Sequence, residues 1–137
     1  MAQIAEVSVD KASGAIRVHK IWAVVDPGTT ISPANVAYQI EGGAIFGTSA
    51  ALHERITITG GVVKQSNFHD YPLLRINEAP VLEVKLMPDP TARVAGVGES
   101  GLPPAAPAIA NAVYALTGKR LRELPMLPER VKAAAKA

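Results

Sequence analysis

Apolar and polar residues alternate along residues 2–28, on both sides of the segment Lys11-Ala12-Ser13-Gly14. Alternation with a period of two is typical of a strand that buries one face, and glycine favours the tight turn between two such strands. This pattern predicts an antiparallel pair of strands that ends at the turn Asp26-Pro27-Gly28. The side chains expected to be buried are Ile4, Val7, Val9, Ile16, Val18 and Ile21.

The following segment, residues 32–54, changes to the spacing of a helix. Ser32 and Pro33 suit the N-cap and the first helical position. Glycine inside a helix costs roughly 1 kcal/mol relative to alanine. Three glycines of this segment therefore either mark a break in the helix or allow another backbone or a ligand to come close: Gly42, Gly43 and Gly47. The apolar residues at helical separations are Val36, Ile40, Ile45 and Ala50.

The next segments return to the pattern of strands. Residues 55–65 alternate around Gly60-Gly61, which predicts a second hairpin. Residues 66–80 form an irregular passage of polar and aromatic residues, and residues 81–88 alternate as a further strand.

Two helices are expected in the last third of the chain. Residues 105–117 are apolar at Ile109, Val113 and Leu116, with Gly118 as the stop signal. A short helix is expected from Pro128. Strands and helices follow one another without a βαβ rhythm, so we expect the α+β class, with antiparallel hairpins packed against two or three helices.

Composition narrows the classes of partner. The net charge of +2 is too small to indicate a nucleic acid partner. The absence of cysteine excludes disulfides, Fe–S ligation and thiolate metal sites within this chain. The first ten residues lack the regions of a signal peptide, and no apolar run approaches the roughly 18 residues of a membrane span. We therefore expect a cytoplasmic protein without a membrane partner.

Neither the histidines nor the segment Asn67–Tyr71 predicts a metal site. His19, His53 and His69 lie far apart in different expected elements and lack the close spacing of metal ligands. The segment Asn67–Tyr71 places histidine and aspartate beside two aromatic residues, a composition that also suits a polar pocket. An ordered loop held by its own side-chain hydrogen bonds is the preferred interpretation. No residue is therefore assigned as a metal ligand.

The segment Gly96–Pro107 places one carboxylate, Glu99, between glycines and ahead of three prolines. It matches neither the phosphate-binding spacing GxxxxGK[ST] nor the GxSxG pattern of hydrolases. A carboxylate held in a fixed position at low solvent exposure is suited to act as a general base. Alternatively, Glu99 interacts with the positive end of the helix that follows it. The residues by themselves leave both interpretations open.

Two longer stretches carry a family resemblance. The C-terminal end of the molybdenum-binding large subunit of the xanthine dehydrogenase and aldehyde oxidase family resembles residues 96–126, GVGESGLPPAAPAIANAVYALTGKRLRELPM. The preceding segment of the bacterial branch of that family, the isoquinoline 1-oxidoreductase and aldehyde dehydrogenase β-subunits, is similar to residues 25–80. The likeness runs from about residue 4 to residue 127, nearly the whole chain.

The resemblance implies roles for five residues. Glu99 matches the catalytic glutamate of the family, which takes a proton from the molybdenum-bound hydroxyl as that oxygen attacks the substrate carbon. Gln39 matches the glutamine whose amide contacts the pterin cofactor. Gly42 and Gly43 are then expected to allow close approach to the cofactor or to a neighbouring element. Asn35, one helical turn before Gln39, is expected to share its face and is a further candidate for binding the cofactor.

The resemblance also implies a larger assembly. Large subunits of the family are several times longer, so residues 1–137 are expected to form a single partial domain that shares the cofactor with other chains or domains. We expect molybdopterin in its cytosine dinucleotide form, with molybdenum held by the cofactor's dithiolene. The expected partners are the remainder of the large subunit and a 2Fe–2S small subunit. Many relatives carry a second glutamine shortly after the matched motif, where this chain has Phe46-Gly47, so the resemblance does not extend to a cofactor contact at that point.

Two hypotheses about function follow. In the first, the chain is the C-terminal piece of a molybdenum hydroxylase, which oxidises aldehydes or N-heterocycles with oxygen drawn from water, and it is inactive alone. In the second, it is a non-catalytic remnant or interaction module that binds no cofactor and self-associates through an apolar surface. The two differ in whether the chain, purified with its partners, contains molybdenum.

Overall fold

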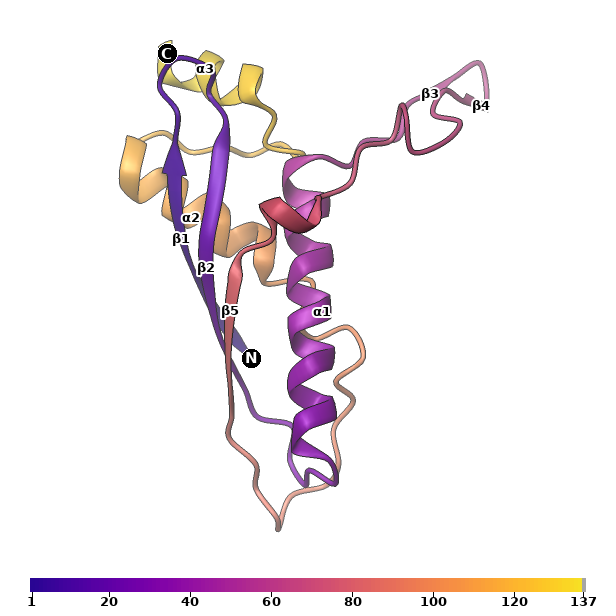
Figure 1. The fold of residues 1–137 in the computed structure, drawn as a ribbon, viewed down its shortest axis with the longest axis vertical. Coiled ribbons are helices and arrows are strands. Elements are labelled where there is room, and N and C mark those ends of the chain that lie inside the picture. Colours follow the sequence, from indigo (N-terminus) through magenta and orange to yellow (C-terminus); the bar gives the residue numbers. More distant parts are fainter. Residues whose placement is uncertain (137) are drawn as a thin grey trace.

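A mixed three-stranded sheet organises the protein, whose computed structural model describes residues 1–136. Strand β1 (Ala2–Val9) pairs with β2 (Ile16–Val25) in antiparallel orientation, which confirms the first predicted hairpin. Strand β5 (Val81–Leu86) adds to the other edge of β2 in parallel orientation, so the order is β1-β2-β5 (Figure 1).

The parallel pairing of β2 with β5 was not expected from the sequence. Parallel strands require a crossover connection, and helix α1 (Pro33–Leu52) lies in that connection. The chain therefore contains one βαβ unit, although its fold class remains α+β as predicted. Alternation within residues 81–88 identified the strand but held no information about its partner.

Helices α1 and α2 (Ala105–Thr117) cover the same face of the sheet. Ile21 of β2 belongs to a core cluster with Ile109 of α2 and Leu52 of α1. Farther along the same face of β2, Val25 packs in a second cluster with Ile40 of α1. This common face contains the hydrophobic core, and it brings α1 beside the segment that precedes α2.

A β-bulge in β2 explains why Val18 and Ile21 are both buried as predicted. Relative to β1, strand β2 carries one extra residue, His19, and this lets Val18 and Ile21 both face the core. Strand β1 alternates without a bulge, so Ile4 faces away from Val7. Ile4 is 68% exposed, and the expectation that it is buried was wrong.

Helix α2 ends at the predicted stop, with Gly118 in the left-handed region at φ 71°. Ile109 and Val113 are buried as predicted, whereas Leu116 is 57% exposed. In Figure 1 the C-terminal end of α2 extends beyond the edge strand β1. The expected final helix is present as α3 (Pro128–Lys136).

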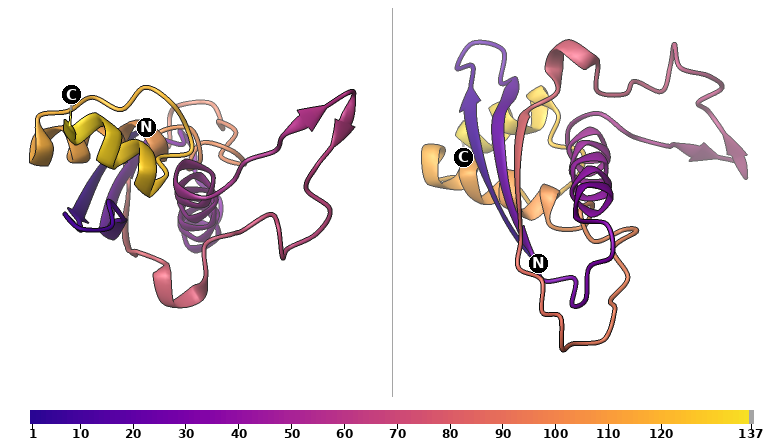
Figure 2. Two further views of the ribbon diagram at one scale, coloured as in Figure 1. Left: turned by 90° about the horizontal axis from the view of Figure 1, so that it is seen from above. Right: turned by 60° about the horizontal axis from the view of Figure 1, so that its bottom comes forward.

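A long arm extends away from the sheet and the helices (Figure 2). It contains the predicted second hairpin as two short strands, β3 (Ile58–Thr59) and β4 (Val62–Val63), followed by the 3-10 helix η1 (Ile76–Glu78). The loop before η1 is ordered by Asp70, which accepts hydrogen bonds from the backbone of Ser66 and Asn67. This confirms the prediction that the segment Asn67–Tyr71 is an ordered loop held by its own side-chain hydrogen bonds.

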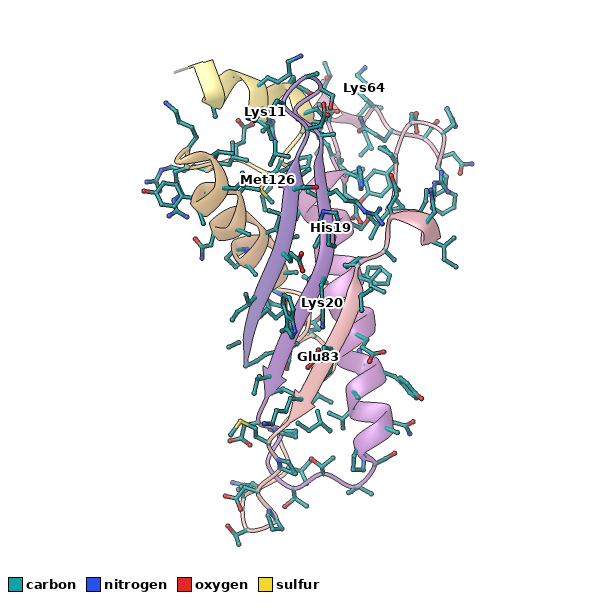
Figure 3. All side chains as sticks on the ribbon, turned by 60° about the vertical axis from the view of Figure 1, so that its left-hand side comes forward. Lys11, His19, Lys20, Lys64, Glu83 and Met126 are labelled. Carbon is teal, nitrogen blue, oxygen red and sulfur yellow. The ribbon has the colours of Figure 1, made fainter. Side chains whose placement is uncertain are left out.

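The outer face of the sheet carries charged side chains. Lys20 on β2 and Glu83 on β5 point toward one another, with Nζ and Oε2 2.7 Å apart (Figure 3). The Lys20 ammonium also lies over the ring of Trp22, 4.6 Å from its centroid. Within residues 1–136, no helix is long and apolar enough to cross a membrane.

Candidate functional site

Glu99 and Gln39 lie beside the same hollow, between α1 and the loop that precedes α2. The amide of Gln39 donates a hydrogen bond of 2.6 Å to the carbonyl oxygen of Gly98, the residue before Glu99. The hollow has a volume of about 310 Å³. Its lining residues are Tyr38, Gln39, Gly42, Gly43, Phe46, Gly98, Glu99 and Leu102. Four of the five predicted site residues are therefore together.

Asn35 lies in the neighbouring hollow rather than beside Glu99. That second hollow measures about 380 Å³ and is shared with the loop before α2. Gln39 and Gly98 line both hollows, so they form the wall between them. Asn35 is therefore on the same side of α1 as Gln39, one turn farther from the carboxylate.

The side chain of Glu99 is exposed in this chain. The low solvent exposure expected for this carboxylate is therefore not provided by residues 1–136. Glu99 is neither the N-cap of α2 nor part of its first turn. Helix α2 begins at Ala105 with Pro104 at its N-cap, and its first turn contains no acidic residue. Glu99 instead occupies a turn closed by the Leu102 N–H, which donates to the Glu99 carbonyl oxygen at 3.0 Å.

The glycines of α1 do not break the helix, which is continuous from Pro33 to Leu52. A Cβ atom on Gly43 would lie 3.1 Å from the Cα of Gly101, and one on Gly47 would lie 2.7 Å from the Cβ of Ala105. These two glycines therefore permit the close approach of the loop after Glu99. Gly42 has no such neighbour within 4 Å and presents bare backbone to the hollow.

A further glutamine, which sequence reasoning missed, contacts the same loop. Gln3 of β1 donates from Nε2 to the carbonyl oxygen of Gly101 at 2.8 Å. Gln3 has the same inward parity as Ala5, Val7 and Val9. A polar residue at an inward position of an amphipathic strand is the signal by which it could have been found.

Two aromatic side chains, Tyr38 and Phe46, also line the hollow with Glu99, and each is 68% exposed. Phe46, part of the pair Phe46-Gly47 at which the chain departs from the resemblance, therefore borders this hollow. A larger hollow of about 450 Å³ lies elsewhere, between the β1–β2 turn, α2 and α3. It includes neither Glu99 nor Gln39, so the smaller hollow is the better candidate site. The described residues contain no cluster of three His, Asp or Glu side chains that could bind a metal ion.

Known proteins resemble this chain over most of its length. Residues 1–80 match the family described as molybdopterin cofactor-binding domain. The β-subunit of isoquinoline 1-oxidoreductase from Brevundimonas diminuta is 43% identical over 128 residues, which are 93% of this chain and 16% of that protein. A nicotinate dehydrogenase subunit from Pseudomonas putida is 38% identical, over 97% of this chain and 11% of that protein.

A solved structure shows the same fold. Quinoline 2-oxidoreductase from Pseudomonas putida 86 superposes with a TM-score of 0.86 at 27% identity, over 96% of this chain and 18% of that chain. The chain thus spans less than a fifth of the length of these relatives.

Proposed function

Because this chain belongs to the molybdopterin cofactor-binding domain family, we propose that it supplies a general base, Glu99, and a cofactor-binding amide, Gln39, to a molybdenum hydroxylase. One observation carries the proposal. The two side chains line one hollow, and the Gln39 amide is hydrogen-bonded to the residue immediately before Glu99. The remainder of the site comes from the rest of a large subunit.

The residues around the hollow fit a pterin cofactor. One N–H of the Gln39 amide is engaged by Gly98, while among residues 1–136 its second N–H and its Oε1 have no hydrogen-bond partner. An amide with a donor and an acceptor matches the edge of a heterocycle. At Gly42 and Gly98 a Cβ would meet no atom within 4 Å, so both leave bare backbone beside the hollow. Gln39, Gly42 and Gly43 are the proposed cofactor contacts, with Asn35 in the adjoining hollow.

When bound, molybdopterin with its molybdenum supplies the redox centre at which the substrate is oxidised. The chain itself contributes a carboxylate that accepts a proton from the attacking oxygen. General base catalysis of this kind contributes typically about 10²–10⁴-fold to the rate. Since Glu99 is exposed in this chain, its shielding from water is assigned to the cofactor and to the remainder of the large subunit.

The proposed reaction is oxidative hydroxylation with oxygen drawn from water. The three relatives compared above are named for isoquinoline, nicotinate and quinoline, all of which are N-heterocycles. An N-heterocycle is therefore the first proposed substrate class, and an aldehyde is the second. The proposed partners are the remainder of the large subunit and a 2Fe–2S small subunit, and the proposed cofactor form is the cytosine dinucleotide. The chain alone is expected to be inactive.

The test is Glu99→Gln in the assembled enzyme. Glutamine keeps the shape of the side chain but accepts no proton, so turnover should fall by about 10²-fold or more, with the molybdenum content unchanged. Glu6→Gln is the matched control, because Glu6 is an exposed glutamate on β1. Near-normal turnover of Glu99→Gln would exclude this role.

A second candidate function is that of a non-catalytic interaction module. It is favoured by the exposed apolar side chains of the arm, which are Ile56, Ile58, Val62, Val63 and Phe68. Exposed apolar patches mark interaction surfaces. Metal analysis of the chain purified with its native partners separates the two functions, since this candidate requires a complex without molybdenum.

A further inference from the structure

The turn that contains Glu99 is held from two sides by glutamine side chains. Gln39 of α1 donates to the carbonyl oxygen of Gly98, one residue before Glu99, at 2.6 Å. Gln3 of β1 donates to the carbonyl oxygen of Gly101, two residues after it, at 2.8 Å. The donors come from different elements, so the two ends of the turn are attached separately to the helix and to the sheet.

The position of Gln3 is unusual for an amide. Gln3 lies on the core-facing side of β1, and its Oε1 is buried without a hydrogen-bond partner in the described chain. Burial of a polar atom without a partner costs free energy, and an apolar side chain of similar shape avoids that cost. Core packing alone therefore does not explain a glutamine here. The bond to Gly101 is the interaction that an apolar residue could not make.

The backbone at Gly101 is already confined by α1. A Cβ atom on Gly101 would lie 3.2 Å from the Cα of Gly43 and would clash with the carbonyl oxygen of Ile40. Gly101 thus lies between α1 on one side and the Gln3 amide on the other. The Leu102 N–H closes the turn by donating to the Glu99 carbonyl oxygen. The backbone of the turn is fixed, while the carboxylate itself remains exposed toward the hollow.

We propose that Gln3 is a positioning residue for Glu99: its amide holds the Gly101 end of the turn, as Gln39 holds the Gly98 end. This inference rests on the proposed function of Glu99 as the general base. Placement of a base depends on supporting hydrogen bonds, and small displacements of a catalytic group reduce turnover more than they reduce substrate binding.

The first experiment measures the turn in this chain without any cofactor. In Gln3→Met, which keeps the length of the side chain and removes the donor, the Leu102 amide should exchange with solvent about tenfold faster, while the Ile109 amide inside α2 changes by less than about twofold. Glu6→Met is the matched control on the exposed side of β1. Unchanged exchange at Leu102, or an equal increase at Ile109, overturns the proposal.

The second experiment uses the assembled enzyme. Gln3→Met and Gln3→Glu, which keeps the shape but places an acceptor against the Gly101 carbonyl, should both lower kcat about tenfold or more, with KM and molybdenum content unchanged. An unchanged kcat, or a loss explained by lower molybdenum content, overturns the proposal. The Glu99→Gln enzyme distinguishes a failure of this proposal about Gln3 from a failure of the proposed function of Glu99. If Glu99→Gln is fully active, the proposed function fails whatever Gln3 does to the turn.

Discussion

The amide nitrogen of Gln39 lies 2.6 Å from the carbonyl oxygen of Gly98 and donates a hydrogen bond to it. This bond joins α1 to the loop that carries Glu99. The residue proposed to bind the cofactor therefore also supports the residue proposed as the base. A change at Gln39 should affect both.

Replacement of Gln39 by methionine tests this double role. The bond to Gly98 is exposed, so the chain alone should lose no more than about 1 kcal/mol of unfolding free energy. In the assembled enzyme, molybdenum content should fall because the cofactor loses an amide contact. Gln65→Met is the matched control, since the Gln65 amide contacts Thr57 in the arm. A full complement of molybdenum in Gln39→Met would contradict the assigned contact.

The glycines of α1 should respond differently to the same substitution. Gly47→Ala places a Cβ against the carbonyl oxygen of Leu102 and the Cβ of Ala105, so overpacking should lower the unfolding free energy by about 1–3 kcal/mol. Gly42→Ala meets no neighbour and should stabilise the helix by roughly 0.5–1 kcal/mol. Urea denaturation of both variants measures the difference, and equal stabilities would show that α1 does not approach the loop closely at Gly47.

Two apolar residues of α2 should differ in their contribution to stability. Ile109 is fully buried, so Ile109→Ala should lower the unfolding free energy by about 2–5 kcal/mol. Leu116 is 57% exposed, so Leu116→Ala should stay within about 0.5 kcal/mol of the wild type. Denaturant titration of the two variants is the measurement. A large loss in Leu116→Ala would mean that this side chain is covered.

The loop of the arm should depend on pH through Asp70. The backbone N–H of Asn67 is the largest cause that holds the pKa of Asp70 below its ordinary value of 3.8, with Ser66 adding further hydrogen bonds. Because the pKa of Asp70 is lower in the folded protein, the ionised carboxylate contributes fully to loop order when the pH is above the ordinary pKa. That contribution is lost as the pH falls through the lowered pKa of the folded state.

The NMR signal of the Asn67 amide reports this titration. Its chemical shift should change with a midpoint below 3.8, and Asp70→Asn should abolish the change. A midpoint at or above 3.8 would show that the carboxylate is not held by these backbone donors.

Local patterns predicted most of the elements but not how they pair. Alternation identified β1, β2 and β5, and helical spacing with Pro33 and Gly118 identified α1 and α2. The parallel pairing of β2 with β5 escaped prediction because it joins strands separated by the whole crossover connection. Ile4 was assigned to the wrong face because β1 alternates without a bulge, so Ile4 lies on the opposite side from Val7 and Val9.

The sequence by itself identified the candidate base and amide, because the motifs around Glu99 and Gln39 carry a family resemblance that is read from neighbouring residues. The tertiary structure decided that these side chains share one hollow, that Glu99 is exposed within this chain, and that Gln3 supports its turn. Those features depend on contacts between segments far apart in the chain. Such contacts arise when the helix and the sheet pack around the loop. The periodicity of a single segment does not predict that packing.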